Sequence, residues 1–504
     1  MSQLTFAQWE ERADSLDVRA QAFIGGEFVD SASGQTFDSI SPRNGTVLAR
    51  VAECDTADVD RAVAAARTAF EAGSWSQLPP AQRKRVLLRL VALIHEHREE
   101  LALLETLDMG KPISDAYSVD LNSVATCLQF YAEAVDKVYG EVAPTGPHQL
   151  GLITREPLGV IAAVVPWNFP LLMTAWKLGP ALATGNSVVL KPAEQSPLSA
   201  LRLAELYAEA GLPEGVLNVV PGFGETAGAA LGRHMDVDAV GFTGSVEVGK
   251  MFLRYSGESN AKSVSLECGG KTPHIVMADT PDLDAAARNV AAGIFFNQGE
   301  VCNAGSRLLV QDSIKDELLE LVVHHGRAMT PGDPLDPASK AGALVDERQL
   351  ETVLGYIEAG QQEGARLVEG GQRVRTDSGG YFVEPTVFDG VRNDMRIAQE
   401  EIFGPVLSTI EFGSADEAIA IGNDTVYGLA AAVWTRDVSV AHRVARSLRA
   451  GTVWVNCFDS SDITVPFGGY KQSGFGRDKS LHAMEKYTQL KTTWLDLTPA
   501  DGAG

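Results

Sequence analysis

The chain has 504 residues, 45% of them hydrophobic and 21% charged. It is therefore long and apolar enough to form roughly two large domains or three smaller ones, each with a buried core. Its formal net charge of −24 argues against a nucleic-acid partner, because a polyanion would be repelled over most of the surface. No apolar run is long enough to span a bilayer and the N-terminus has no signal-peptide pattern, so we expect a cytoplasmic protein without a membrane partner.

The first half of the chain alternates between short β-branched runs and longer segments with helical spacing. The predicted strands lie at 160–166, 186–192, 216–221, 239–244 and 263–270. The predicted helices lie at 171–183, 199–211, 225–234 and 246–256. This strand–helix–strand rhythm predicts an α/β fold with a doubly wound parallel sheet.

The alternation starts again after Lys271. Predicted strands follow at 273–277, 306–311, 430–435 and 452–456, with helices at 282–296, 314–329 and 441–451. A second α/β unit is therefore expected, and Cys302 lies near its start.

Two glycine-rich turns follow strands of the first unit. Gly222, Gly224 and Ala227 in "PGFGETAG" approximate a dinucleotide-binding fingerprint, and Gly244 and Ser245 occupy another junction between a strand and a helix. Both turns could direct backbone N–H groups at a pyrophosphate. Tight turns need glycine in any case, so each match alone leaves both interpretations open.

The five cysteines, Cys54, Cys127, Cys268, Cys302 and Cys457, are far apart and contain no CxxC pair. We therefore expect neither disulfides nor a metal site. In "FFNQGEVCNAG", Cys302 occupies a glycine-flanked turn that could expose a thiolate. A buried, inert thiol is the competing interpretation; a thiol protease is disfavoured because the histidines show no protease pattern.

Two polar residues occupy positions that favour chemistry. Glu267 ends an apolar strand in "VSLECGGK", where a carboxylate is costly unless it is solvated, paired with Lys271 or used as a general base. Asn168 in "VVPWNFPLL" stands between two prolines that fix its backbone. Its amide could cap a turn or donate a hydrogen bond to an oxyanion.

Six stretches together resemble the NAD(P)-dependent aldehyde dehydrogenase family over nearly the whole chain. They are "VPWNFPLLMTAWKLGPALATGNSVVLKPAEQSPLSA", "GFTGSVEVGK", "LECGGK", "NQGEVCNAGSR", "EEIFGPVL" and "PFGGYKQSGFGR", in the family's order and spacing. Cys268 departs from the pattern, because the family more often has leucine there.

The resemblance implies a role for each matched residue. Cys302 would be the nucleophile, Glu267 the base, and Asn168 the oxyanion donor together with the Cys302 backbone N–H. NAD would be the cofactor, with NADP weaker, held by Pro166, Trp167, Lys191, Glu194, Gly224, Gly244, Ser245, Glu401 and Phe403. The fingerprint alone would nominate Asp236 or Asp238 as the ribose acid, whereas the resemblance points to Glu194.

The closest resemblance is to γ-glutamyl-aminobutyraldehyde and other ω-amino aldehyde dehydrogenases of polyamine breakdown. The expected tunnel residues are Asp120, Ser123, Phe169, Met173, Trp176, Val301, Asn303, Asp459, Ser461 and Phe467. Asp120 and Asp459 are candidate partners for an ammonium; the competing interpretation is that both are structural, since similar acids occur in relatives with apolar substrates. The alternatives are a general aliphatic aldehyde dehydrogenase, an acylating enzyme that uses coenzyme A, and a non-catalytic, crystallin-like member of the fold.

The resemblance also implies a division of the chain. Residues 1–139 and 159–270 would form a Rossmann-type NAD-binding domain, and 271–485 an α/β catalytic domain. A hairpin at 140–158 and the segment 486–497 would build the interface of a homodimer or homotetramer.

Overall fold

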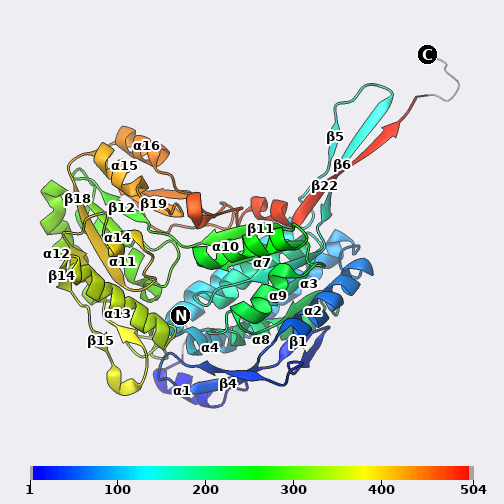
Figure 1. Ribbon diagram of the computed structural model, residues 1–504, viewed down its shortest axis with the longest axis horizontal. Helices are drawn as coiled ribbons and strands as arrows, with labels where there is room; N and C mark the ends of the chain where they lie inside the picture. Colours follow the sequence, from blue (N-terminus) through cyan, green and yellow to red (C-terminus); the bar gives the residue numbers. More distant parts are fainter. Residues whose placement is uncertain (1–3, 499–504) are drawn as a thin grey trace.

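Two large β-sheets and a projecting arm organise the chain in the computed structural model, which describes residues 4–498 (Figure 1). The first sheet has eight strands in the order β2-β1-β9-β8-β7-β10-β11-β21. Their bounds are Glu27–Val29, Ala22–Ile24, Leu217–Val219, Ser187–Lys191, Val160–Val164, Ala239–Gly244, Ser263–Cys268 and Gly474–Phe475. The five strands from β9 to β11 are parallel, and antiparallel strands lie at both edges.

Helices cover both faces of this sheet, and alternate residues of β7 show how. Ile161 and Ala163 pack into one apolar cluster, while Val160, Ala162 and Val164 pack into another. The first cluster contains α3 (Pro80–Glu96), α4 (Arg98–Met109), α6 (Leu121–Ala134), α7 (Pro170–Ala183) and α8 (Leu198–Glu209). The second contains α2 (Thr56–Glu71), α9 (Ala229–Arg233) and α10 (Val246–Glu258). The predicted doubly wound parallel sheet is confirmed.

The second sheet has seven strands in the order β14-β17-β18-β13-β12-β19-β20. Their bounds are Arg366–Glu369, Thr386–Asp389, Val406–Phe412, Arg307–Gln311, Pro273–Val276, Ala430–Trp434 and Thr452–Val455. The helices α11 (Leu283–Phe295) and α12 (Lys315–Arg327) pack on one face. The opposite cluster includes α13 (Glu347–Gln362), α14 (Arg396–Gln399), α15 (Ala415–Asn423) and α16 (Val438–Ser447). The predicted restart after Lys271 is confirmed.

A three-stranded arm extends away from both sheets (Figure 1). It consists of β5 (Glu141–Ala143), β6 (Gln149–Pro157) and β22 (Thr488–Asp496), and β22 pairs with β6 along nine residues. The smaller elements are α1 (Phe6–Asp14), α5 (Ile113–Asp115), the β3–β4 pair (Thr36–Ile40 and Val47–Ala52) and the β15–β16 pair (Arg373–Val374 and Phe382–Val383).

One predicted helix has a different form. The segment predicted as a helix at 225–234 begins as a π-helical turn at Gly224–Gly228, and only Ala229–Arg233 is α-helical. Gly222 before it has φ +155°, and a Cβ there would lie 2.6 Å from the Cys54 carbonyl oxygen. The tight exit from β9 therefore requires glycine.

The domain boundaries inferred from the resemblance remain a prediction.

Candidate active site

The loop that carries Cys302 has an unusual backbone. Asn297, Gln298 and Gly299 have φ values of 47°, 57° and 74°, all in the left-handed region. A Cβ on Gly299 would lie 2.2 Å from the Gly404 carbonyl oxygen. Such a run persists only where the surrounding structure enforces it, and it is typical of functional loops.

Asn168 is tied to this loop. Its side chain is buried, and its Nδ2 donates to the Glu300 carbonyl oxygen at 2.8 Å. Asn297 Nδ2 donates to the Asn168 carbonyl oxygen at 3.4 Å. An amide nitrogen carries two hydrogens. Within residues 4–498, the second hydrogen of the Asn168 amide has no acceptor. This hydrogen is therefore free to donate to the oxygen of a bound substrate. Glu300, which accepts the first hydrogen, precedes Cys302 by two residues.

Cys302 itself is half-buried. Burial raises the pKa of its thiol, and the negative charges of Glu401, Asp459 and Glu267 raise it further. The thiol is therefore protonated at neutral pH until a positive charge or a proton acceptor comes close.

Glu267, in β11, is an unpaired buried carboxylate. It is 4% exposed, and neither carboxylate oxygen has a hydrogen-bond partner in the described chain. Burial raises the pKa of Glu267 well above its ordinary value, and the charge of Asp478 adds to this effect. The salt bridge considered with Lys271 is not formed, because Lys271 Nζ donates to the Ile397 carbonyl oxygen at 2.7 Å. A proton acceptor held without a partner is suited to general base catalysis.

Two glycines bring the functional loops into contact. A Cβ on Gly270 would lie 3.0 Å from the Cys302 carbonyl oxygen, and one on Gly269 would overlap the Glu401 carboxylate. Gly270 N–H donates to Glu401 Oε1 at 3.1 Å. Burial raises the pKa of Glu401 to about 7. The pair directly after β11 therefore places Cys302, Glu267 and Glu401 in one neighbourhood.

The carboxyl ends of the parallel strands in the first sheet are where a fold of this type has its ligand-binding crevice. The chain runs from β7 outward to β8 and β9, then returns to β10 on the other side of β7. Such a reversal is where open α/β sheets bind ligands. The predicted cofactor residues that follow these strands are Pro166, Trp167, Lys191, Glu194, Gly224, Gly244 and Ser245.

Lys191 and Glu194 are joined at the end of β8. Lys191 Nζ donates to the Pro192 carbonyl oxygen at 2.9 Å and to Glu194 Oε2 at 3.2 Å. Burial lowers the pKa of Lys191. The Glu194 side chain is 31% exposed, so the pair consists of one buried ammonium and one accessible carboxylate.

The turns after β9 and β10 have features that suit a phosphate. Ser245 caps α10, accepting from the Val248 N–H at 3.2 Å, and α10 is 13 residues long. No atom lies within 4 Å of a Cβ built on Gly224, so space beside that backbone is open. Helix N-termini and open glycine turns bind anions.

Trp167 and Phe403 form an aromatic pair between the two α/β units. Trp167 and Phe403 meet edge to face, with ring centroids 5.2 Å apart. Phe403 has φ +55°, and Gln349 Nε2 donates to its carbonyl oxygen at 2.8 Å. The structure thus brings Phe403, from the second unit, against the turn that follows β7.

Residues 28–493 match the model of the aldehyde dehydrogenase family. The chain belongs to that family. The resemblance in the sequence and the fold that it implied are thereby confirmed, and the chain is an oxidoreductase of the aldehyde dehydrogenase type.

Its relatives carry different substrate names. The NADP/NAD-dependent aldehyde dehydrogenase PuuC of Escherichia coli (strain K12) is 54% identical, over 97% of this chain and 98% of that protein. Two solved structures each cover 98% of this chain and 100% of their own. A mutant of the P. syringae indole-3-acetaldehyde dehydrogenase AldA, in complex with NAD+ and IAA, is 61% identical with a TM-score of 0.97. The γ-glutamyl-γ-aminobutyraldehyde dehydrogenase of Burkholderia cenocepacia J2315 is 60% identical with a TM-score of 0.96.

Aromatic rings line much of the tunnel expected in this family member. Trp176 and Phe467 pack with centroids 5.3 Å apart, and Phe169 stacks on Phe296 at 6.4 Å. Met173 is buried one turn after Phe169 and donates its N–H to the Phe169 carbonyl oxygen at 2.8 Å. These side chains could enclose an alkyl or aromatic substrate.

The contacts of Asp120 favour its structural interpretation over a role as a partner for a substrate ammonium. Asp120 is 1% exposed, and its carboxylate is paired with the Lys111 ammonium. Lys111 also lies over the Phe169 ring, 4.1 Å from its centroid, and 3.9 Å from Glu105 Oε2. The Lys111 ammonium therefore occupies the position beside Asp120 that a substrate ammonium would need.

The remaining tunnel residues are partly engaged. The Ser123 hydroxyl donates to the Val119 carbonyl oxygen at 2.9 Å, in the π-helical turn Ala116–Asp120 directly before α6. Asn303, next to Cys302, donates from Nδ2 to Asp459 Oδ1 at 2.8 Å, and Val301 is half-buried on the other side of Cys302. Asp459 has φ +52°, so the backbone is held in a strained conformation where its carboxylate meets the nucleophile loop.

Four charged residues near the site were missed by the sequence reasoning. Lys177 is 1% exposed and donates to Asp478 Oδ2 at 2.5 Å, while Lys486 contacts the other Asp478 oxygen. This charged group sets the electrostatic surroundings of Glu267. Lys479 contacts the tunnel residue Ser461. A lysine in the apolar segment "LLMTAWKLGPALA" was the one available signal for Lys177.

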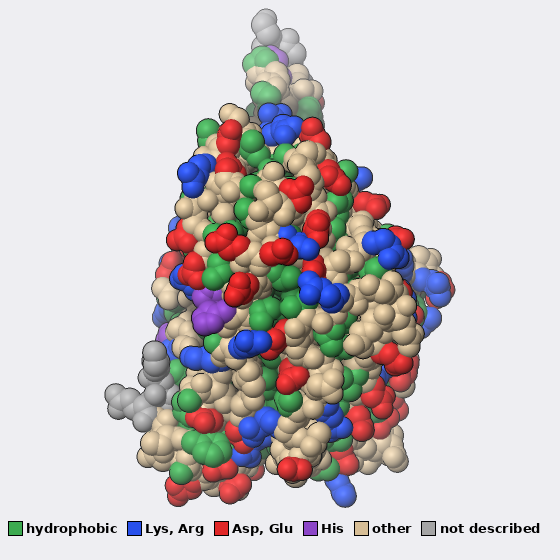
Figure 2. All heavy atoms as spheres, turned by 90° about the vertical axis from the view of Figure 1, so that its left-hand side faces the viewer, with side chains coloured by type: hydrophobic (Ala, Val, Ile, Leu, Met, Phe, Trp, Pro, Cys, Tyr) green, Lys and Arg blue, Asp and Glu red, His purple; other side chains and the backbone are tan. Residues whose placement is uncertain are grey.

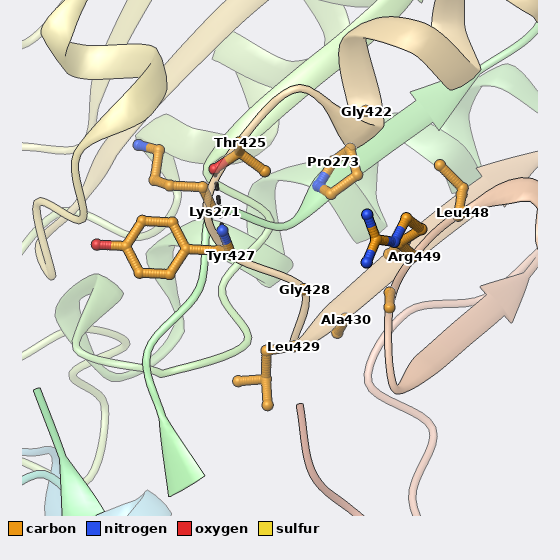
Figure 3. Close-up of a pocket in the computed structure, with 12 residues that line it drawn as sticks. Lys271, Pro273, Gly422, Thr425, Tyr427, Gly428, Leu429, Ala430, Leu448 and Arg449 are labelled. Atoms are coloured by element: carbon orange, nitrogen blue, oxygen red, sulfur yellow. Dashed lines mark hydrogen bonds between the residues drawn. The ribbon is translucent and has the colours of Figure 1, made fainter. Parts of the chain in front are cut away.

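A separate small pocket beside Lys271 is not the tunnel (Figure 3). Its walls include Pro273, Thr425, Tyr427 and Arg449, and it contains none of the predicted cofactor or tunnel residues. Burial lowers the pKa of Lys271 to about 7.

Figure 2 shows acidic and basic side chains interspersed over the outer face of the second unit. Within the described residues, no helix is long and apolar enough to cross a membrane.

Proposed function

We propose that this chain oxidises an aldehyde to a carboxylic acid with NAD. The observation that carries the proposal is the convergence of a half-buried Cys302, the free hydrogen of the fixed Asn168 amide, and the unpaired buried carboxylate of Glu267. Nucleophile, oxyanion donor and base are the groups that acyl chemistry through a thioester requires.

The steps follow from these groups. The Cys302 thiolate attacks the aldehyde carbon, and the carbonyl electrons move onto oxygen, where Asn168 and the Cys302 N–H donate hydrogen bonds. Loss of hydride from the tetrahedral carbon leaves a thioester. Glu267 then removes a proton from water, the resulting hydroxide attacks the thioester, and the thiolate leaves with the acid as product.

The crevice fits NAD. When bound, NAD supplies the hydride acceptor and a positive ring charge near the thiol. Gly244 and Ser245 at the start of α10 would hold its pyrophosphate, with Gly224 at the adenine end. Lys191 and the accessible Glu194 would hold the adenine-side ribose, and Glu401 and Phe403 the nicotinamide end. A carboxylate at Glu194 would repel a 2′-phosphate, so NADP should bind more weakly.

For the substrate we propose an ω-amino or γ-glutamylamino aldehyde. The support comes from the polar positions Asp459 and Ser461 and from the γ-glutamyl-γ-aminobutyraldehyde dehydrogenase named above. The aromatic walls support the alternative of a general aldehyde dehydrogenase, as does the similarity to the indole-3-acetaldehyde dehydrogenase. A role in polyamine breakdown follows only if the substrate is an ω-amino or γ-glutamylamino aldehyde.

The arm is proposed as an interface with a second copy of the chain. Val142, Leu490 and Trp494 are 66%, 60% and 56% exposed, and β22 forms a free edge. Exposed apolar side chains along an unpaired edge strand are a template for association. A homodimer or homotetramer is therefore expected. The cytoplasmic location remains a prediction.

One assay separates the classes of function. Purified protein with NAD and propanal should produce NADH without coenzyme A, because Glu267 supplies the base that acylating enzymes lack. Cys302→Ala should abolish the NADH signal while NAD still quenches the intrinsic fluorescence. An absolute requirement for coenzyme A would indicate an acylating enzyme. No NADH from a panel of charged, amide-bearing and aliphatic aldehydes would indicate a non-catalytic member of the fold.

A further inference from the structure

Lys479 is a buried cation beside the proposed tunnel. Its side chain contacts two predicted tunnel residues: Nζ donates to the Ser461 hydroxyl and lies 5.9 Å from the centroid of the Trp176 ring. Lys479 is 5% exposed, and within residues 4–498 no carboxylate lies within 4 Å of its ammonium group. An ammonium has three hydrogens, and one neutral hydroxyl satisfies only one of them.

The backbone fixes Lys479 in this place. The preceding residue, Asp478, exchanges two 2.8 Å hydrogen bonds with Phe467, and the following residue, Ser480, donates its N–H to the Ile463 carbonyl oxygen at 2.7 Å. Lys479 itself has φ +61°, in the left-handed region. These backbone bonds hold the Lys479 backbone against the segment 459–467, so its side chain starts from a fixed position close to Ser461.

The charge at this position has only distant compensation. Burial lowers the pKa of Lys479, and the negative charges of Asp459 and Asp462 act against this effect from beyond ion-pair distance. A buried cation without a direct partner is costly, whereas a cation that meets a ligand anion gains a charge-assisted hydrogen bond. By contrast, the buried lysines Lys111 and Lys177 have carboxylate partners of their own.

We infer that Lys479 is a specificity residue of the active site, which binds a carboxylate at the end of the substrate remote from the aldehyde. The inference rests on the proposed function and refines its substrate class. A γ-glutamylamino aldehyde has such a carboxylate, with an ammonium beside it that the Asp459 carboxylate could receive. A simple ω-amino aldehyde has only the cation, which Lys479 would repel.

The substrate-side test requires no mutation. Wild-type kcat/KM is measured for γ-glutamyl-4-aminobutanal, for the same compound with its α-carboxylate converted to a carboxamide, for 4-aminobutanal and for pentanal. Loss of the carboxylate should lower kcat/KM about 10- to 100-fold, mainly through KM, as expected for a charge-assisted hydrogen bond. 4-Aminobutanal should be poorer than pentanal. If the carboxamide is used equally well, the inference is wrong.

Lys479→Met replaces the ammonium that lies 5.9 Å from the Trp176 ring centroid with a neutral side chain of similar length. It should reduce kcat/KM for the γ-glutamyl substrate about 10- to 100-fold, leave pentanal within about twofold, and abolish the difference between carboxylate and carboxamide. Lys479→Arg should retain that difference. Lys137→Met, which removes an exposed lysine three residues after the end of α6, is the charge control.

Equal losses for all substrates in Lys479→Met, with Lys479→Arg no better, would show a purely structural role. Pentanal also keeps the two proposals separate. If wild type oxidises pentanal but does not distinguish carboxylate from carboxamide, only the Lys479 inference fails. If wild type oxidises no aldehyde, the proposed function fails.

Discussion

The Asn168 amide donates a 2.8 Å hydrogen bond to the Glu300 carbonyl oxygen, two residues before Cys302. This bond fixes the amide and leaves its second hydrogen available to donate to a substrate oxygen. Asn168→Ala should therefore lower kcat about 10²- to 10³-fold, as removal of an oxyanion donor does in other enzymes. Stopped-flow NADH formation measures the effect, and NAD affinity by fluorescence is the control. A change confined to KM would contradict the role.

Glu267→Gln should separate the two halves of the reaction. The amide cannot take a proton from water, but the thioester can still form. One NADH per active site should appear in a burst, followed by a steady state slower by about 10²-fold or more. The ratio of burst amplitude to active sites checks this. Absence of the burst would mean that hydride transfer also depends on Glu267.

The same substitution should change stability in a pH-dependent way. Burial raises the pKa of Glu267, so the folded protein keeps a proton that the unfolded chain releases. The stability of the wild type therefore falls as pH rises from the ordinary glutamate pKa through the raised value. Glu267→Gln should have nearly the wild-type Tm at about pH 4 to 5 and a Tm about 1–3 °C higher at pH 8. Scanning calorimetry across this range is the measurement, and a constant difference would contradict the assignment.

Asp478→Asn should destabilise the protein by about 3–5 kcal/mol, because it leaves the buried Lys177 ammonium without a counter-charge. Thermal unfolding and chemical denaturation give the change. Lys177→Met combined with Asp478→Leu should be less harmful than Asp478→Asn, because the buried lysine is removed together with its partner. If Asp478→Asn has the wild-type Tm, the pair is not a source of stability.

Trp494→Lys should weaken the assembly, because it places a charge on the exposed apolar surface of the arm. Size-exclusion chromatography with light scattering should show a smaller species at low micromolar concentration. Val438→Lys is the matched control, since Val438 is 68% exposed on α16, away from the arm. If wild type is a monomer at all concentrations, the interface proposal fails.

Local signals predicted much of this molecule. The strands around Ala162 and Leu309 were predictable because buried parallel strands are continuous apolar runs, and the glycine-flanked stretches marked Cys302 and Glu267. Charge pairing was not predictable. Lys111 lies in the loop after α4 and Asp120 lies nine positions later in the π-helical turn Ala116–Asp120, and nothing in the sequence indicates that they meet. Lys479 was missed for the same reason, since its importance depends on Trp176 and Ser461 from distant segments.

The nine-residue pairing of β6 with β22 also affects biosynthesis. Thr488 lies opposite Pro157 and Asp496 opposite Gln149, so the strand partners are more than 300 positions apart. On the ribosome, β5 and β6 emerge early. The edge of β6 that pairs with β22 remains unpaired until β22 has been translated. A prematurely terminated product that lacks β22 can form much of the first sheet but not the arm. If subunits assemble through the arm, as proposed above, only chains whose synthesis includes β22 would join the assembly.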